Sequence, residues 1–391
     1  MTKPLTTWQD VSAAKIAARD ALLPKEWLLP KPPGDDVKNV MDIPRTCGIL
    51  SDKEIEITET PALDLIAKLK AKELTSVEVT TAFCKRATIA CQLTNCLSEV
   101  FFDQALKDAA KIDADYAATG TPAGALHGLP VSLKDNIDIK GLDTPIGFTN
   151  SANKPAADDA QIAKILRNAG AVLYCKTTVP TGMLMTETYS NLMGYTPNPY
   201  QRECSAGGSS GGEGVLVAMR GSPLGNGTDI GGSVRIPAAL NGIFGLKPAA
   251  GRFPLRGMRA GLPGQEAVRS VIGPMGNDLD SIELWCKVVL ESQPWEHDPM
   301  VYNLPWREVK LPEKLCFGAL RLCQLDDTNG RNLPRRRRLQ ANPSGPACTC
   351  RNPCRPRGCR TQGRRLHAVQ PSRGWCAPHG PSWRRRRFQA R

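Results

Sequence analysis

Histidine is scarce in this sequence, with four residues among 391. Only His127 and His297 lie before residue 320. A hydrolase built on a Ser-His-Asp triad would have to take its base from these two, and we expect both to make ordinary hydrogen bonds. No clustered ligands accompany them, so we predict no metal site. Neither a Walker A loop nor a dinucleotide fingerprint stands in a strand-to-helix context, so we expect no cofactor.

Long apolar runs are also missing. No stretch of about 18 uncharged apolar residues occurs, and residues 1–20 lack the apolar core of a secretory signal. The cysteines of residues 1–320 are scattered singly, without the short repeated spacings of a zinc site or a disulfide-rich scaffold. These absences predict a cytoplasmic protein with reduced thiols and no transmembrane segment.

Lysine is absent from residues 321–391, which hold 18 Arg against Asp326 and Asp327, a net charge of +16. Because the whole chain carries +13, residues 1–320 carry −3. The basic excess therefore belongs to one end of the chain. We expect no nucleic-acid partner for residues 1–320.

The spacing of apolar residues indicates an α/β fold. Helices are predicted over residues 8–27, 62–72, 76–91, 102–118 and 157–168, with Ser76 as an N-cap after Thr75. The run GLPVSLKDNIDIKG predicts a strand followed by a loop, and AVLYCKTTV predicts a buried strand. The Pro-rich stretch LLPKPPGDD follows the first helix, and we assign residues 1–60 to an N-terminal arm and residues 61–320 to the main domain.

Glycine and serine are concentrated between residues 205 and 248. Glycine is favoured where backbone amides must approach a ligand closely, and Ser209, Ser210 and Ser233 lie within these runs. A serine becomes a good nucleophile when a neighbouring base takes its proton, and its intermediate needs amide donors for the oxyanion. The sequence DIGGS, ending at Ser233, offers successive amides with little side-chain bulk. Lys134, on an apolar strand before a polar loop, could be the base if burial lowers its pKa.

Four segments together resemble the amidase signature family. Residues 207–214 (GGSSGGEG) and 225–237 (GNGTDIGGSVRIP) are similar to its signature. Residues 129–135 (LPVSLKD) resemble its lysine motif, and 244–248 (FGLKP) resemble a segment further along. The resemblance spans residues 60–320 and is closest to the fungal general amidases and acetamidases, with fatty acid amide hydrolase as a relative. It implies a mixed, twisted β-sheet covered by helices on both faces.

The resemblance also implies a role for each site residue in the hydrolysis of a small-molecule carboxylic acid amide. Ser233 would attack the carbonyl, Lys134 would be a neutral base, and Ser209, after a cis peptide bond at Gly208, would relay the proton. The resemblance implies that the oxyanion is held by backbone amides beside Ser209, those of Ile230, Gly231, Gly232 and Ser233. It implies that Met183 lines the acyl pocket. It also implies that hydrogen bonds from four side chains hold the loop, those of Ser210, Thr228, Asp229 and Arg235. A homodimer is the candidate assembly.

Two other functions compete with an amidase. Residues 207–211 also satisfy G-x-S-x-G, the nucleophile elbow of α/β-hydrolase esterases, but no HGGG-type segment precedes Ser209 and only His297 follows it before residue 320. The second is a non-catalytic protein that binds polyanions through the RRRR runs at 335–338 and 384–387.

The Arg-, Pro- and Cys-rich composition of residues 321–391 cannot make a core, so we predict disorder there. Besides a nucleic-acid arm, its cysteines could ligate a metal, although C-x-C-x3-C-x4-C from Cys348 to Cys359 matches no standard zinc site. An out-of-frame or intron-derived translation would favour Arg, Pro, Cys and Gly, and we prefer this interpretation. It predicts an amidase fold that is truncated at its C-terminus, with uncertain activity.

Overall fold

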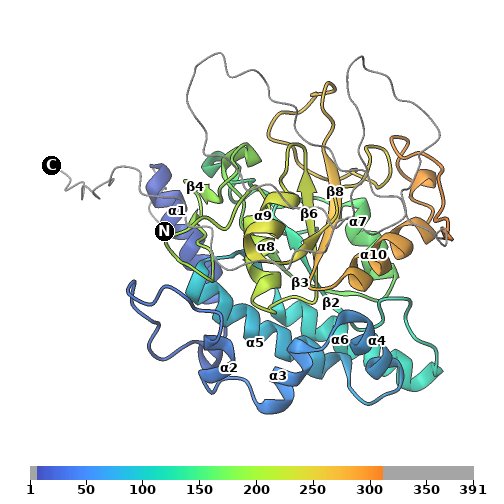
Figure 1. The fold of residues 1–391 in the computed structure, drawn as a ribbon, viewed down its shortest axis with the longest axis horizontal. Coiled ribbons are helices and arrows are strands. Elements are labelled where there is room, and N and C mark those ends of the chain that lie inside the picture. Colours follow the sequence, from blue (N-terminus) through green and yellow to red (C-terminus); the bar gives the residue numbers. More distant parts are fainter. Residues whose placement is uncertain (1–6, 311–391) are drawn as a thin grey trace, which may run out of the picture. The chain divides into compact units, whose positions relative to one another are not determined.

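The computed structural model describes residues 7–310, and a six-stranded sheet in the order β1-β3-β2-β6-β8-β7 forms their centre (Figure 1). Its strands are β1 (Leu97–Val100), β2 (Pro130–Lys134), β3 (Val172–Thr177), β6 (Leu224–Asp229), β7 (Phe244–Gly245) and β8 (Val271–Gly276), and β4 (Tyr189–Ser190) pairs separately with β5 (Gly194–Tyr195). Strand β2 is parallel to both β3 and β6, whereas the β1/β3, β6/β8 and β7/β8 pairs are antiparallel. The sheet is mixed, as the sequence predicted.

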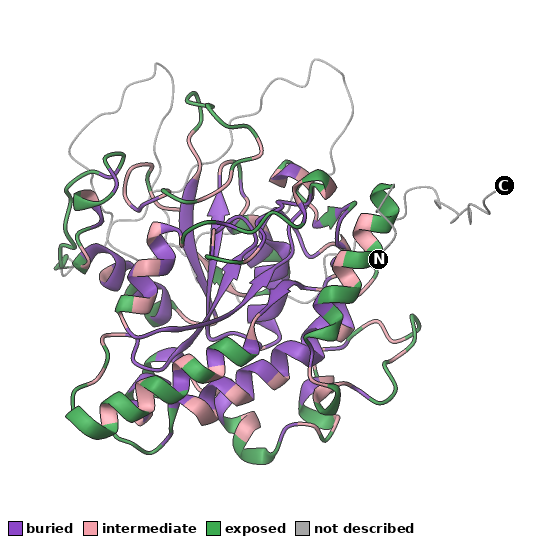
Figure 2. Ribbon diagram, turned by 180° about the vertical axis from the view of Figure 1, so that it is seen from behind, coloured by how far each residue is buried: buried purple, intermediate pink, exposed green. Residues whose placement is uncertain are grey.

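Helices cover both faces of this sheet, whose strands are almost wholly buried (Figure 2). The helices are α1 (Trp8–Ala21), α2 (Ile43–Thr46), α3 (Asp52–Glu59), α4 (Ala62–Lys70), α5 (Ser76–Thr94), α6 (Phe102–Thr119), α7 (Gln161–Asn168), α8 (Gly211–Ala218), α9 (Arg235–Asn241) and α10 (Leu279–Glu291). Val131 and Leu133 of β2 share one core cluster with α4, α7 and α10. Because successive side chains of a strand point to opposite faces, Ser132 and Lys134 lie on the other face, toward α8.

The residues that the sequence assigns to an arm pack against this second face. Leu23, Leu29, Val40 and Leu50 are buried in one cluster with residues of α5, α6 and α8. The guanidinium of Arg19 donates hydrogen bonds to the side chain of Asn95 and to the carbonyl of Leu97, at 2.7 and 2.8 Å. This packing fixes α1 against the start of β1.

Two predicted helix boundaries differ from the structure by four residues or more. The helix predicted over residues 8–27 ends at Ala21, and a separate 3₁₀ turn (Lys25–Trp27) follows Pro24, which has no amide hydrogen to continue the helix. The helix predicted from residue 157 begins at Gln161. The Ala160 amide donates instead to the carbonyl of Asp138, so the chain before α7 is tied to the loop after β2.

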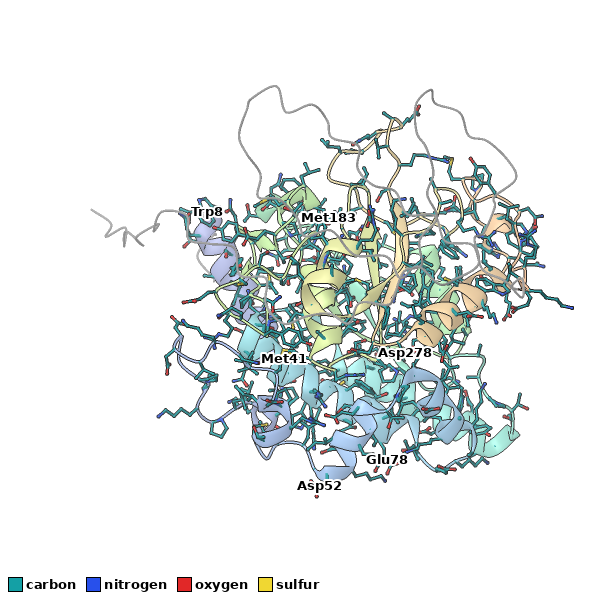
Figure 3. The ribbon with its side chains drawn as sticks, in the orientation of Figure 1. Trp8, Met41, Asp52, Glu78, Met183 and Asp278 are labelled. Carbon is teal, nitrogen blue, oxygen red and sulfur yellow. The ribbon has the colours of Figure 1, made fainter. Side chains whose placement is uncertain are left out.

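The start of α5 shows a capping box. The Glu78 amide donates to Thr75 Oγ1 at 3.1 Å, and the Thr75 amide donates to the Glu78 carboxylate at 2.9 Å. The prediction that Ser76 is the N-cap is therefore wrong by one residue. Figure 3 shows Glu78 near the lower edge of the molecule.

Thr75→Ala should lower the free energy of unfolding by about 1 kcal/mol, because it removes one half of this capping box. Denaturant titration of both proteins measures the difference. Thr75→Ser keeps the accepting hydroxyl and should stay within about 0.5 kcal/mol of the wild type. An alanine variant as stable as the wild type would show that the cap contributes nothing.

No helix within residues 7–310 is long and apolar enough to cross a bilayer. The predictions for residues 321–391, including disorder, polyanion binding and metal ligation, concern residues outside the described part of the chain.

Candidate active site

Lys134 ends β2 with a fully buried side chain. Its Nζ lies 2.7 Å from Ser209 Oγ and 2.8 Å from Thr228 Oγ1, and it lies 3.3 Å from the Thr228 carbonyl oxygen. Every polar neighbour of the amine is thus a hydroxyl or a carbonyl. No carboxylate of residues 7–310 is in direct contact with it, so a positive charge at this position would have no ion-pair partner among them.

Burial lowers the pKa of Lys134 to about 7, although the charges of Asp229, Glu213 and Asp135 act in the opposite direction. A substantial fraction of the amine is therefore neutral at physiological pH. A neutral amine accepts a proton, which a solvated lysine with a pKa near 10.5 cannot do at pH 7.

The loop that carries Ser209 is hydrogen-bonded to the segment between Thr228 and Ser233. The bond between Gly208 and Ser209 is cis, and Ser209 is almost fully buried. The Ser210 amide donates to the carbonyl of Ser233 at 3.1 Å, and the Thr228 amide donates to Ser210 Oγ at 3.3 Å. With the contact between Lys134 and Ser209, these bonds bring segments 129–135, 207–214 and 225–237 into one site.

Ser233 is partly exposed, in contrast to Lys134 and Ser209. Within residues 7–310 its hydroxyl makes no hydrogen bond, and Ser209 Oγ is bonded to Lys134 instead, so the structure does not join Ser233 to Ser209 directly. The Gly232 amide donates to Asp229 at 2.8 Å. Of the four amides predicted for an oxyanion site, those of Ile230, Gly231 and Ser233 donate no hydrogen bond to another residue within 7–310.

The carboxylate of Asp229 holds the loop before α9 in place through hydrogen bonds. Its buried carboxylate accepts hydrogen bonds from the Gly232 and Val234 amides at 2.8 and 3.0 Å and from the Arg235 guanidinium at 3.0 and 3.1 Å. Burial would raise the pKa of this carboxyl, but the bonds from Arg235, Val234 and Gly232 outweigh it and lower the pKa to about 2. Asp229 is therefore a fixed negative charge that shapes the turn ending at Ser233.

Asp229→Asn should shift the pH profile of the site as well as its stability. The variant loses the charge that favours protonated Lys134, so the Lys134 pKa should fall below 7 and the acidic limb of activity should move to lower pH. Hydrogen bonds to a charged acceptor contribute about 1.5–3 kcal/mol each, so the free energy of unfolding at pH 7 should also decrease. Rate against pH, with denaturant titration, measures both effects.

Asp278→Asn is the matched control, because Asp278 caps α10 by accepting from the Ser281 amide at 2.7 Å. It should change stability without moving the pH profile. The stabilisation by Asp229 has a defined window: it is present above pH 4 and is lost as pH falls toward 2, because the folded pKa lies below the ordinary 3.8. An unshifted acidic limb in Asp229→Asn would contradict the electrostatic coupling.

The segment that contains Met183 covers the Ser209 loop. A Cβ on Gly208 would lie 2.6 Å from the carbonyl oxygen of Met185 and 2.7 Å from the amide of Glu187, so glycine is needed for this close approach. Met183 itself is half-buried and lies above α8 and α9 in Figure 3. Its place in an acyl pocket stays a prediction.

The two histidines of the described residues lie apart from this chemistry. His127 Nδ1 accepts from the Ala123 amide at 3.0 Å, and its ring lies edge-on to Tyr116. Ser209 is bonded to Lys134 and to neither histidine, which does not fit a nucleophile elbow. Among residues 7–310, no group of three or more His, Cys, Asp or Glu is arranged to hold a metal ion.

Sequence reasoning missed two buried groups near the site. Lys176 on β3 donates to the Asp143 carbonyl at 2.6 Å and to Thr144 Oγ1 at 3.0 Å. Glu213 on α8 is fully buried beside β2. A charged residue inside an otherwise apolar run is the signal for Lys176, and a carboxylate within a Gly/Ser motif is the signal for Glu213.

The sequence profile of the Amidase family matches residues 78–326. The chain belongs to the amidase family. It is 47% identical over 319 residues to an acetamidase of Emericella nidulans, covering 81% of this chain and 58% of the relative. A putative amidase of Schizosaccharomyces pombe is 44% identical over 315 residues, covering 80% and 59%.

Solved structures confirm the fold class. A fatty acid amide hydrolase structure superposes with a TM-score of 0.76 at 36% identity, covering 78% of this chain and 55% of that protein. The peptide amidase of Stenotrophomonas maltophilia gives a TM-score of 0.55 at 32% identity, with 59% and 48% covered. The predicted family and the mixed sheet with helices on both faces are thus confirmed, and this amidase-family chain spans less than two thirds of the length of these relatives.

Proposed function

We propose that the protein hydrolyses a carboxylic acid amide through an acyl-enzyme on Ser233. The observation that carries this proposal is Lys134, a fully buried amine with a pKa lowered by burial to about 7, placed 2.7 Å from Ser209 Oγ. Membership of the amidase family supports it, as do relatives named acetamidase and amidase.

The proposed mechanism moves one proton along three side chains. Neutral Lys134 takes the proton of Ser209, and Ser209 takes that of Ser233 as the Ser233 oxygen attacks the carbonyl carbon. The amides of Ile230, Gly231 and Ser233 face the developing oxyanion. The proton returns through Ser209 to the leaving nitrogen as the C–N bond breaks.

Water then completes the cycle. It attacks the acyl carbon and transfers its proton along the same route, which releases the carboxylic acid and restores the Ser233 hydroxyl. The reactants are the amide and water, and the enzyme's protons return to their starting positions, so atoms and charge balance over the cycle. The products are a carboxylate and ammonia or an amine.

The substrate class in this proposal is a small linear amide, since relatives of this chain are named acetamidases. Cytoplasmic location and a homodimer remain predictions from the sequence. An esterase remains the alternative, because the same acyl-enzyme could form from an ester.

The test is to measure ammonia release from acetamide, butyramide and hexanamide by the full chain, beside release of alcohol from the matching ethyl esters. A fluorophosphonate probe followed by peptide mapping then identifies the nucleophile. We expect ammonia release and labelling at Ser233. Labelling at Ser209, or turnover of esters without amides, would contradict the proposal.

A further inference from the structure

Glu213 is a buried acid that the proposed mechanism does not use. It lies in the first turn of α8, four residues after Ser209, and its side chain is fully buried. The Glu213 Oε2 atom lies 2.7 Å from Ser132 Oγ. Ser132 is two residues before Lys134 on β2, and both side chains leave the strand on the same face.

Two contacts of equal length therefore join α8 and the loop before it to β2. One is Lys134 Nζ to Ser209 Oγ at 2.7 Å, and the other is Ser132 Oγ to Glu213 Oε2 at 2.7 Å. A single contact would leave the loop free to pivot about the lysine. Two contacts about 6.6 Å apart along the strand fix both its distance and its direction.

Glu213 also contacts the strand that leads to Ser233. Gly225 of β6 is in register with Ser132, and a Cβ on Gly225 would lie 2.5 Å from Glu213 Oε2. The carboxyl therefore occupies the space that a side chain on β6 would need. It packs at the point where β2, β6 and α8 meet.

From this geometry we propose that Glu213 is a positioning residue that clamps β2 to α8 and thereby sets the contact between Lys134 and Ser209. This role rests on the proposed amide hydrolysis for its effect on rate. Among residues 7–310, no hydrogen bond joins Glu213 to Ser209 or Ser233, so it acts through Ser132 and Lys134.

The hydrogen bonds of the Ser132 and Ser222 hydroxyls bear on whether Glu213 is neutral or ionised. Ser132 Oγ lies 2.7 Å from Glu213 Oε2 and 2.9 Å from Ser222 Oγ, and Ser222 Oγ itself donates to the Leu224 carbonyl at 3.0 Å. An ionised Glu213 would take the single proton of Ser132 and leave the contact with Ser222 without one. A neutral Glu213 lets both contacts form, because it donates to Ser132 while Ser132 donates to Ser222.

The burial of Glu213 agrees with a neutral acid. Burial raises the pKa of Glu213 to about 8, although hydrogen bonds from Ser132, Thr177 and the Asn226 amide to its ionised form, and the charge of Lys134, act in the opposite direction. The titratable groups that face it are Lys134, Tyr174 and Cys175, and burial raises the pKa of the phenol and of the thiol. An ionised Glu213 would favour protonated Lys134, so a neutral one keeps the base available.

The test uses the full chain with Glu213→Gln, Glu213→Ala and Ser132→Ala. Glutamine can still donate to Ser132, so we expect kcat within about threefold of the wild type and an acidic limb within about 0.3 pH unit. Glu213→Ala should lower kcat by about 100-fold with KM within about twofold, because misplacement by about 1 Å has that effect. Ser132→Ala should lower kcat by about tenfold, and it serves where Glu213→Ala fails to fold.

Glu99→Ala is the matched control, since Glu99 is a second buried acid whose pKa burial raises, but it pairs with Lys15 at 2.6 Å. It should destabilise the protein without changing kcat. An alanine variant of Glu213 or Ser132 with wild-type kcat would overturn the clamp. A Glu213→Gln variant as impaired as Glu213→Ala would overturn the neutral acid.

A readout independent of activity separates this inference from the proposed function. The ¹³Cε shift of Lys134, assigned with Lys134→Met, should titrate near pH 7 in the wild type and in Glu213→Gln. In Glu213→Ala or Ser132→Ala the midpoint should rise by about one unit or more, as the loosened site admits water. If the wild type is inactive but the Lys134 midpoint rises in the alanine variants, the proposed amide hydrolysis is rejected and the positioning role of Glu213 stands. If the midpoint is the same in all variants, the positioning role of Glu213 is rejected.

Discussion

Ser233→Ala should abolish amide hydrolysis, with kcat lower by about 10⁴-fold or more, because no acyl-enzyme can form without the hydroxyl. The buried amine and Ser209 would remain in place, but Ser209 is almost fully buried and bonded to Lys134, so it cannot replace a partly exposed nucleophile. Ammonia release and fluorophosphonate labelling both measure the loss. Labelling should disappear entirely.

Ser292→Ala is a suitable control, because Ser292 is the C-cap of α10 and its hydroxyl donates to the Val289 carbonyl at 2.7 Å. It should keep full activity. Ser209→Ala should lie between the two variants, since water could carry the proton less efficiently. If Ser233→Ala kept more than a few per cent of the activity, the nucleophile would have to be sought elsewhere.

The fold was largely predictable because its elements carry regular apolar spacing. The sequence placed β2, β3 and α5 within a few residues of their observed bounds. The differences arise where tertiary contacts replace helical ones. The Ala160 amide bonds to the Asp138 carbonyl rather than starting α7, a contact that no local pattern encodes.

The site was predictable only as far as its motifs reach. Lys134, Ser209 and Ser233 each stand in a recognisable segment, but the sequence could not show which hydrogen bonds join them. Four backbone amides were predicted to hold the oxyanion, but in the structure the Gly232 amide donates a hydrogen bond to the Asp229 carboxylate. The pairing of Ser132 with Glu213 spans 81 positions and depends on the parallel register of β2 and β6.

Lys134→Met should lower kcat by about 10²- to 10⁴-fold, because it removes the base while keeping the length and the apolar stem of the side chain. In the wild type, kcat/KM should rise tenfold per pH unit below about 7 and level off above it, as the buried amine loses its proton. The Met variant should lack this limb. Measuring kcat/KM from pH 5 to 9 tests both statements.

Lys134→Arg is the matched control for size and charge, since a guanidinium stays protonated and should be as inactive as methionine. Stability gives a check that needs no substrate. The folded pKa lies near 7 and the ordinary value is 10.5, so the unfolded chain binds more protons between these pH values, and wild-type stability should rise with pH relative to Lys134→Met. The slope should approach about 1.4 kcal/mol per unit, and its absence would mean that the buried amine is charged.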